Sequence, residues 1–139
     1  MPSVMFSRLR MVLTSAGIPR SGFDFADGSG MSTYNRVSPR ATVALLRWGM
    51  RQPWAADWRA SLPVGGVDGT LKRRFAGTPL AGQIFAKTGT LNATNALAGL
   101  MRTASGRELT FAIYANDVPD GTSALAAMDA ALVLVAGAN

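Results

Sequence analysis

The sequence predicts an α+β fold in which helices cover an antiparallel sheet. Apolar residues recur at helical spacing near both ends of the chain, and three strand-like runs follow one another between residues 83 and 115. The last two runs are joined by the turn signal Ala104-Ser105-Gly106-Arg107. The expected order is helix, loop, helix, irregular segment, three strands and helix, within a single domain spanning residues 1–139.

Two helices separated by a structured loop are predicted for the first third of the chain. The first should end near Ala16, before a Gly-Ile-Pro stop, and its apolar stripe is Val4, Met5, Leu9, Val12 and Leu13. Residues 27–35, Asp-Gly-Ser-Gly-Met-Ser-Thr-Tyr-Asn, form the loop, because such residues satisfy their own backbone or tolerate positive φ. Ser38 as N-cap and Pro39 at the first helical position begin the second helix, which ends before Pro53.

The remaining two thirds should contain an irregular segment, the sheet and a last helix. Glycine and proline break residues 54–82 into short pieces around a basic turn at 68–74, which we expect to support the site from behind. Strands are predicted at 83–91, 96–103 and 108–115. Thr122 or Ser123 is expected to cap the final helix, whose shared apolar face is predicted to carry Leu125, Met128, Leu132 and Val135.

Composition narrows the possible functions. The 139 residues are 48% hydrophobic, enough for one core, and the net charge of +6 favours anionic partners such as nucleic acid, lipid headgroups or carboxylate-rich polymers. The arginines are scattered without interleaved aromatic residues, which argues against a nucleic-acid groove. Cysteine and histidine are absent, so thiol catalysis and the usual zinc sites are excluded, and we expect no metal and no cofactor.

No membrane span and no signal peptide are predicted. The longest apolar stretch, 130–137, is about half of the 18 or so residues that a span needs. Arg8 and Arg10 interrupt what would have to be the apolar part of a leader.

The segment Lys87-Thr88-Gly89-Thr90 is the strongest candidate for chemistry. It reads as an edge strand that carries a cation, two hydroxyls and a bare glycine, which are the parts needed to hold a carboxylate beside a reacting carbonyl. The glycine would let substrate lie against the backbone, although a β-bulge is another reason for glycine in a strand. No nucleophile pattern accompanies the segment, because the chain contains neither Ser-x-x-Lys nor Ser-x-Asn.

Several stretches in fixed order resemble the C-terminal part of the D-alanyl-D-alanine carboxypeptidase/endopeptidase family, the low-molecular-mass class C penicillin-binding proteins. They are Asp27-Gly28-Ser29-Gly30-Met31-Ser32 with Asn35-Arg36-Val37-Ser38, Leu62-Pro63-Val64-Gly65-Gly66-Val67-Asp68-Gly69-Thr70-Leu71, Gly77-Thr78-Pro79, and Ala86-Lys87-Thr88-Gly89-Thr90-Leu91. A bare Lys-Thr-Gly is a weak signal, whereas two loops and a strand in this order are a strong one.

The resemblance implies a partial penicilloyl-serine-transferase fold of the β-lactamase/transpeptidase type and a serine-type D-Ala-D-Ala carboxypeptidase or endopeptidase of peptidoglycan, located in the periplasm or cell envelope. Its partners would be the peptidoglycan stem peptide and β-lactams. The implied catalytic residues are Lys87, Thr88 and Gly89, and the implied substrate-binding residues are Thr90, Leu91, Met31 and Ser32.

The resemblance also implies that part of the active site is missing. In the family, Ser-x-x-Lys and Ser-x-Asn lie N-terminal to the matched segment, so this chain alone is expected to be inactive. Thr33 stands where family members often carry an arginine suited to the extra carboxylate of diaminopimelate, which leaves substrate preference open. Trp48, Trp54 and Trp58 are expected in the core rather than in a ligand platform.

Two alternatives remain open. The chain could be a non-catalytic remnant or binding module for an anionic cell-wall polymer, or, more distantly, a general anion- or nucleic-acid-binding domain. The family fold also implies that strands and helices of this segment pack on polypeptide outside it, so the unpaired sheet edges and apolar helix faces of the isolated chain should promote self-association.

Overall fold

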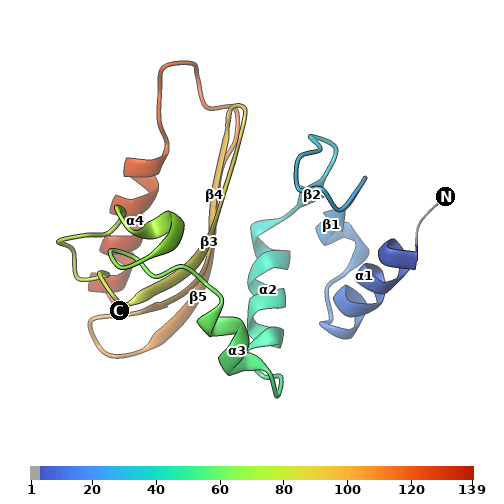
Figure 1. The fold of residues 1–139 in the computed structure, drawn as a ribbon, viewed down its shortest axis with the longest axis horizontal. Coiled ribbons are helices and arrows are strands. Elements are labelled where there is room, and N and C mark those ends of the chain that lie inside the picture. The colour runs from blue at the N-terminus through green and yellow to red at the C-terminus, as the bar shows by residue number, and fades with distance from the viewer. Residues whose placement is uncertain (1–3) are drawn as a thin grey trace.

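The computed structural model describes residues 4–139 and has helices and antiparallel strands in the predicted order (Figure 1). The elements are α1 Val4–Ser15, β1 Phe23–Asp24, β2 Arg36–Val37, α2 Pro39–Gly49, α3 Ala55–Ala60, β3 Ile84–Leu91, β4 Thr94–Arg102, β5 Glu108–Ala115 and α4 Leu125–Gly137, with short 3₁₀ turns at Arg20–Gly22 and Gly69–Leu71.

The main sheet is the predicted antiparallel meander, with strand order β3-β4-β5. The β3–β4 register runs without a break from Ile84 opposite Met101 to Leu91 opposite Thr94. The central strand β4 pairs on both sides, so β3 and β5 form the two edges of this sheet. The α+β prediction is confirmed.

Helices cover both faces of the sheet: α4 lies on one side and α2 on the other (Figure 1). The main core fills the α4 side and consists of Leu71, Phe75, Leu80, Ile84, Ala86, Leu97, Met101, Phe111, Met128, Leu132 and Ala136. A second cluster packs α1 against α2 and consists of Leu13, Ile18, Phe23 and Ala41. The single-domain organisation stays a prediction, because these two clusters are separate.

The helix boundaries follow from the residues predicted to set them. Ser38 caps α2, since its Oγ accepts a hydrogen bond from the Ala41 N–H at 3.1 Å, and Pro39 occupies the first turn. Gly17 adopts a φ of 73° just after α1, in the left-handed region that glycine tolerates best.

Four details differ from the sequence predictions. Residues 54–82, predicted to be irregular, contain the helix α3. The sequence also does not predict the pairing of β1 with β2, which involves two residues of each strand. The N-cap of α4 is Ala124, although the Ser123 hydroxyl accepts from the Leu125 N–H at 3.3 Å. Val135 is 43% exposed, and Ala136 takes its place on the buried face.

The tryptophans do not form part of either core cluster, which corrects the expectation. Trp54 is 44% exposed and packs edge-on between Trp48 and Trp58, with ring centroids 5.7 and 5.5 Å apart. Gly49 makes room for this arrangement, since a Cβ there would lie 1.3 Å from the Trp58 ring. No helix within residues 4–139 is long and apolar enough to cross a membrane.

Candidate active-site strand

The free side of β3 is covered for only part of its length. The Gly65 N–H donates to Ile84 O at 2.9 Å and the Ala86 N–H donates to Pro63 O at 3.0 Å, so residues 63–65 lie along the first half of the strand. Beyond Ala86, no backbone hydrogen bond from another described segment reaches this side of β3.

Strand geometry decides which backbone groups face that open edge. In an antiparallel strand, the N–H and C=O of alternate residues point to the same side. Because Ile84 and Ala86 bond away from β4, the N–H and C=O groups of Thr88 and Thr90 also point away from it. The Thr90 N–H is thus a donor at the open edge.

The side chains of Lys87 and Thr88 lie on opposite faces of the sheet. Ile84 and Ala86 are buried on the α4 side, so Thr88 and Thr90 share that face, and Lys87 and Gly89 belong to the α2 face. The Lys87 ammonium nevertheless reaches the open edge, where it donates to Thr88 O at 2.6 Å.

Lys87 is exposed and has no acidic partner among the described residues. The ion pairs found between residues 4 and 139 are Arg20–Asp24, Arg59–Glu108 and Arg74–Asp129. The ammonium is therefore available to a carboxylate from outside the described part of the chain.

Thr88 and Thr90 differ in whether their hydroxyl protons are available to a ligand. The Thr88 hydroxyl donates to Thr70 Oγ1 at 3.0 Å, so a carboxylate would have to replace Thr70 as its acceptor. The Thr90 hydroxyl accepts from Asn95 Nδ2 at 3.4 Å and keeps its own proton for another acceptor. Sequence reasoning missed Asn95, although the hairpin register would have placed it opposite Thr90.

The basic turn at 68–74 contacts β3. Thr70 contacts Thr88 at its start, and Leu71 and Phe75 are buried in the main core. Arg74 makes a bidentate pair with Asp129 of α4, through Nε to Oδ2 at 3.1 Å and Nη2 to Oδ1 at 2.5 Å.

Gly89 is not required by packing within the described chain. A Cβ at Gly89 would meet only the Ala96 Cβ, at 3.5 Å, and the regular pairing with Ala96 excludes a bulge. Gly99 is different, because a Cβ there would lie 2.0 Å from Phe85 O.

The loop at 27–35 is fixed by its own polar side chains. Asp27 Oδ1 accepts from the Ser29 hydroxyl at 2.8 Å, the Ser29 N–H at 3.0 Å and Asn35 Nδ2 at 3.3 Å. The hydrogen bonds from Ser29, chiefly its hydroxyl, hold the pKa of Asp27 below its ordinary value. Asp27 and Ser29 therefore shape the turn, as the sequence predicted.

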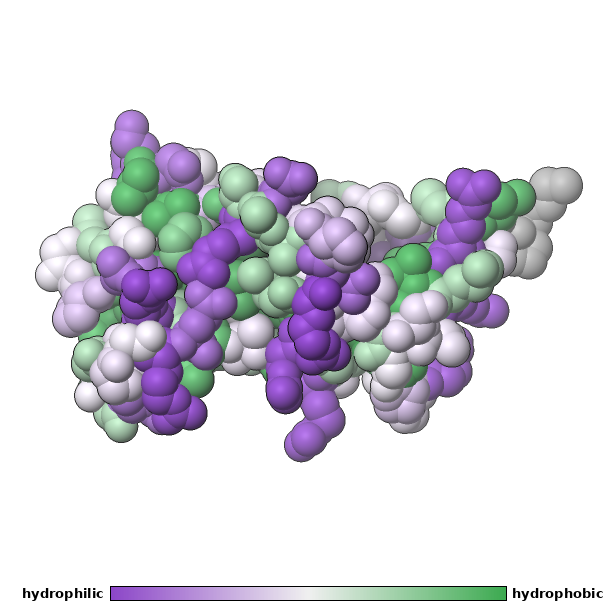
Figure 2. Space-filling view, turned by 90° about the horizontal axis from the view of Figure 1, so that it is seen from below, coloured by the Kyte–Doolittle hydropathy of each residue, from purple (hydrophilic) through white to green (hydrophobic). Residues whose placement is uncertain are grey.

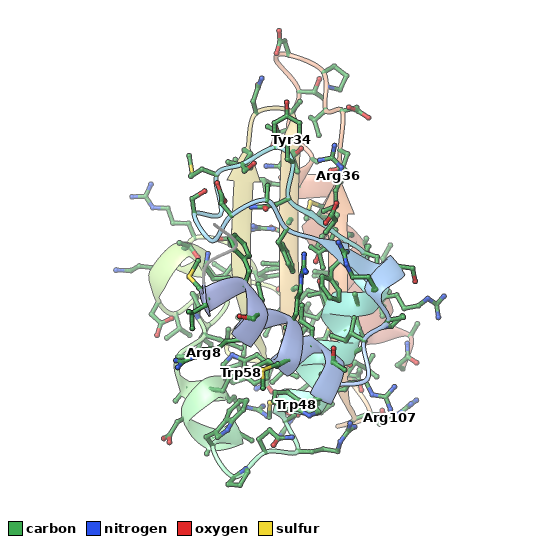
Figure 3. All side chains as sticks on the ribbon, turned by 90° about the vertical axis from the view of Figure 1, so that its right-hand side faces the viewer. Arg8, Tyr34, Arg36, Trp48, Trp58 and Arg107 are labelled. Carbon is green, nitrogen blue, oxygen red and sulfur yellow. The ribbon has the colours of Figure 1, made fainter. Side chains whose placement is uncertain are left out.

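Met31 and Ser32 belong to this loop, and the loop as a whole lies on the α2 side of the main sheet (Figure 1). Figure 3 shows Tyr34 of the same loop in front of the sheet. Met31 is 70% exposed, and Ser32 Oγ accepts from the Tyr34 N–H at 3.2 Å. No hydrogen bond among residues 4–139 joins the loop to β3, so the structure places the loop on this side of the sheet without connecting it to that strand.

Two hollows of the described surface lie away from β3. One of about 430 Å³ is bordered by residues 20–24 and 36–38, and another of about 410 Å³ lies near the C-terminal end of α4. Neither includes Lys87, Thr88, Gly89, Thr90 or Leu91. Residues 4–139 gather no group of three or more metal-ligating side chains, and we assign no metal ligand.

Comparison with known proteins identifies the family. The sequence matches the D-Ala-D-Ala carboxypeptidase 3 (S13) family over residues 5–137. The chain belongs to this family. Among S13 relatives, it is 40% identical over 129 residues to D-alanyl-D-alanine carboxypeptidase of Actinomadura sp. strain R39, covering 89% of this chain and 24% of that protein. It is 41% identical to carboxypeptidase DacB of Mycolicibacterium smegmatis, covering 86% and 28%.

Solved structures agree with this S13 assignment. Penicillin-binding protein 4 (DacB) of Haemophilus influenzae superposes with a TM-score of 0.76 at 30% identity, covering 85% of this chain and 27% of that one. The Bdellovibrio bacteriovorus endopeptidase Bd0816, at 24% identity and a TM-score of 0.72, shows the shared fold. The chain thus spans about a quarter of the length of its S13 relatives.

Proposed function

We propose that this chain supplies the Lys-Thr-Gly wall of a serine-type D-Ala-D-Ala carboxypeptidase or endopeptidase acting on peptidoglycan stem peptides in the cell envelope. The observation that carries the proposal is the open edge of β3, where the Lys87 ammonium, without an acidic partner among the described residues, lies on the strand whose Thr90 N–H is free. Membership of the S13 family supports it.

Each group on β3 has a proposed role. Lys87 and the Thr90 hydroxyl hold the terminal carboxylate of the stem peptide, with Thr88 as a further donor once it releases Thr70. The Thr90 N–H stabilises the oxyanion that develops on the carbonyl of the penultimate D-alanine. Gly89 leaves the strand surface clear for the substrate backbone. Leu91, Met31 and Ser32 are proposed to contact the rest of the substrate.

The reaction is an acyl transfer through a serine ester. The serine oxygen bonds to the carbonyl carbon, the peptide C–N bond breaks, the departing D-alanine amine takes a proton, and water then hydrolyses the ester. These steps need no metal or cofactor. The 139 residues contain no Ser-x-x-Lys, and we assign the serine and its lysine base to polypeptide outside them.

We propose that β-lactams react at the same site, because they acylate the serine that attacks D-Ala-D-Ala. A second structure of the Haemophilus influenzae relative, 31% identical to this chain, is described as a complex with a β-lactam. The proposed acyl-enzyme would form on the same side of the sheet as Lys87.

Fluorescent penicillin tests the proposal in two steps. The 139-residue chain alone should give no covalent adduct, and an adduct would show that it carries its own nucleophile. A chimera of the Haemophilus influenzae protein, in which residues 5–137 replace the matched segment, should be labelled and should release D-alanine. A folded chimera that does neither would contradict the assignment of β3 and favour the binding-module alternative.

Self-association of the isolated chain is a further part of the proposal. The uncovered half of β3 offers unpaired backbone groups, and α1 exposes Val4, Met5, Met11 and Val12. Sedimentation velocity should show a mass that rises with concentration, whereas a monomer at all concentrations would refute it.

A further inference from the structure

Three exposed arginines lie on α2 and on the turn that follows it. Arg47 follows Arg40 by seven residues, which is close to two turns of α2, and Arg51 lies in the turn just after the C-cap Met50. The helical rise places Arg40 and Arg47 about 10 Å apart along the axis of α2. All three are exposed, and we call them the arginine ridge.

Nothing in the described chain neutralises the arginine ridge. Residues 39–53 include no aspartate or glutamate, and the three ion pairs within residues 4–139 use other arginines. Figure 2, which views the molecule from the end where α2 meets α3, shows a band of hydrophilic side chains in the middle of this face. The ridge therefore presents uncompensated positive charge to its surroundings.

The position of Arg40 is electrostatically unfavourable within its own helix. It lies in the first turn of α2, where the helix dipole disfavours a cation, and that turn has no acidic residue. No hydrogen bond or ion pair of Arg40 appears among the described residues. An external anion bound to Arg40 would remove this destabilisation. The contacts within the described fold do not explain why a cation stands at this position.

We propose that the arginine ridge binds a linear polymer of phosphate groups. Three guanidinium groups can be engaged together by an extended polyanion, whereas a small anion meets only one. Guanidinium matches the oxygen geometry of phosphate through paired hydrogen bonds. This inference is independent of the proposed catalytic role, because the ridge lies on α2 and the turn after it, and the catalytic groups lie on β3.

The surroundings of the arginine ridge favour a polymer over a membrane surface. Membrane-surface helices place large apolar side chains beside their cations. The exposed large apolar residues of the described chain include none between 38 and 51. Within α2 the arginines therefore have no exposed large apolar side chain beside them, whereas Val37 and Trp54, on either side of this range, are 40% and 44% exposed.

The test compares two triple variants that carry the same change in charge. Arg40→Gln/Arg47→Gln/Arg51→Gln removes the ridge, and Arg8→Gln/Arg73→Gln/Arg107→Gln removes three exposed arginines from other elements. Figure 3 shows Arg8 on α1 and Arg107 at the β4–β5 turn, well separated from each other. Circular dichroism checks that both variants keep the helices of the parent.

Binding of long-chain inorganic polyphosphate to the 139-residue protein is measured by calorimetry from 50 to 200 mM salt. The ridge variant should bind about 30-fold more weakly at 50 mM salt, and the slope of log K against log salt should fall by about 2, as expected for three lost phosphate contacts. The control variant should lose about 3-fold or less.

Equal losses in the two triple variants would overturn the proposal, since net charge alone would then explain binding. Tighter binding to duplex DNA or to phosphatidylglycerol vesicles than to polyphosphate would also overturn it, by assigning the ridge to another class of partner. If the triple variant fails to fold, Arg47→Glu should weaken polyphosphate binding about 10-fold, and unchanged binding would refute the ridge.

Discussion

Gly89 pairs with Ala96 across the β3–β4 ladder, and a methyl group added to Gly89 would meet the Ala96 Cβ at an ordinary 3.5 Å. Gly89→Ala should therefore leave the free energy of unfolding within about 0.5 kcal/mol of the parent. The added methyl would, however, occupy the surface along which substrate is proposed to lie. Acylation of the chimera by fluorescent penicillin should slow at least about 10-fold.

Gly99→Ala is the matched control, because its Cβ would lie 2.0 Å from Phe85 O and 2.6 Å from Ala86 Cα. This substitution should lower the free energy of unfolding by about 3 kcal/mol or more, measured by urea denaturation. If Gly89→Ala is acylated at the parent rate, substrate does not approach that part of the strand.

Arg74 and Asp129 join the basic turn to α4, with only 14% and 22% of their side chains exposed. Arg74→Met should cost about 2 kcal/mol of unfolding free energy, because it leaves the Asp129 carboxylate partly buried without its partner. The double variant Arg74→Met/Asp129→Leu should recover most of that loss in urea denaturation. A double variant as unstable as the single one would show that packing rather than charge explains the effect.

Ala93 lies at the tip of the β3–β4 hairpin with a φ of 55°, in the left-handed region. Ala93→Gly should raise the free energy of unfolding by about 0.5–1 kcal/mol, because glycine relieves the steric cost of this conformation. Gly106→Ala, at a φ of 84° in the β4–β5 turn, should have the opposite sign. Thermal unfolding measures both changes. An Ala93→Gly variant less stable than the parent would contradict the claim that Ala93 is strained in the folded chain.

The pKa of Asp27 is lowered from its ordinary 3.8 by the hydrogen bonds from Ser29. The folded loop thus binds fewer protons than the unfolded chain in this range. Its stabilising contribution is present above pH 3.8 and is lost as the pH falls through the lowered pKa. In an NMR titration the Ser29 amide should shift with a midpoint below 3.8, and Asp27→Asn should abolish the shift. A midpoint at or above pH 3.8 would contradict the hydrogen bonds from Ser29 to the Asp27 carboxylate.

Much of the fold could be predicted because local signals and tertiary structure agree. Ser38 and Pro39 start α2, and the alternation of Leu109, Phe111 and Ile113 matches the α4-facing side of β5. The six residues of α3 are too few to show helical periodicity, and β1 and β2 depend on pairing across a loop. The sequence predicts Val135 on the buried face of α4, whereas Ala136 is the buried residue. Both neighbours are apolar, and only the rotation of the helix against the sheet decides which of them is buried.

The site was predicted less completely. The residue types of β3 indicated a carboxylate-binding strand, but the side chains of Lys87 and Thr88 point to opposite faces and meet only at the backbone edge. The contacts of Thr88 with Thr70 and of Thr90 with Asn95 depend on how the turn and the hairpin fold beside the strand. Residue patterns within one strand contain no such information.

The most direct test of the account compares the only two lysines of the chain in the chimera. Lys72 is exposed on the basic turn and Lys87 lies on β3, so Lys72→Ala and Lys87→Ala remove the same charge from different places. The rate of acylation by fluorescent penicillin should fall about 100-fold or more for Lys87→Ala and less than about 3-fold for Lys72→Ala. Equal rates in the two folded variants would contradict the claim that β3 forms the carboxylate-binding wall of the active site.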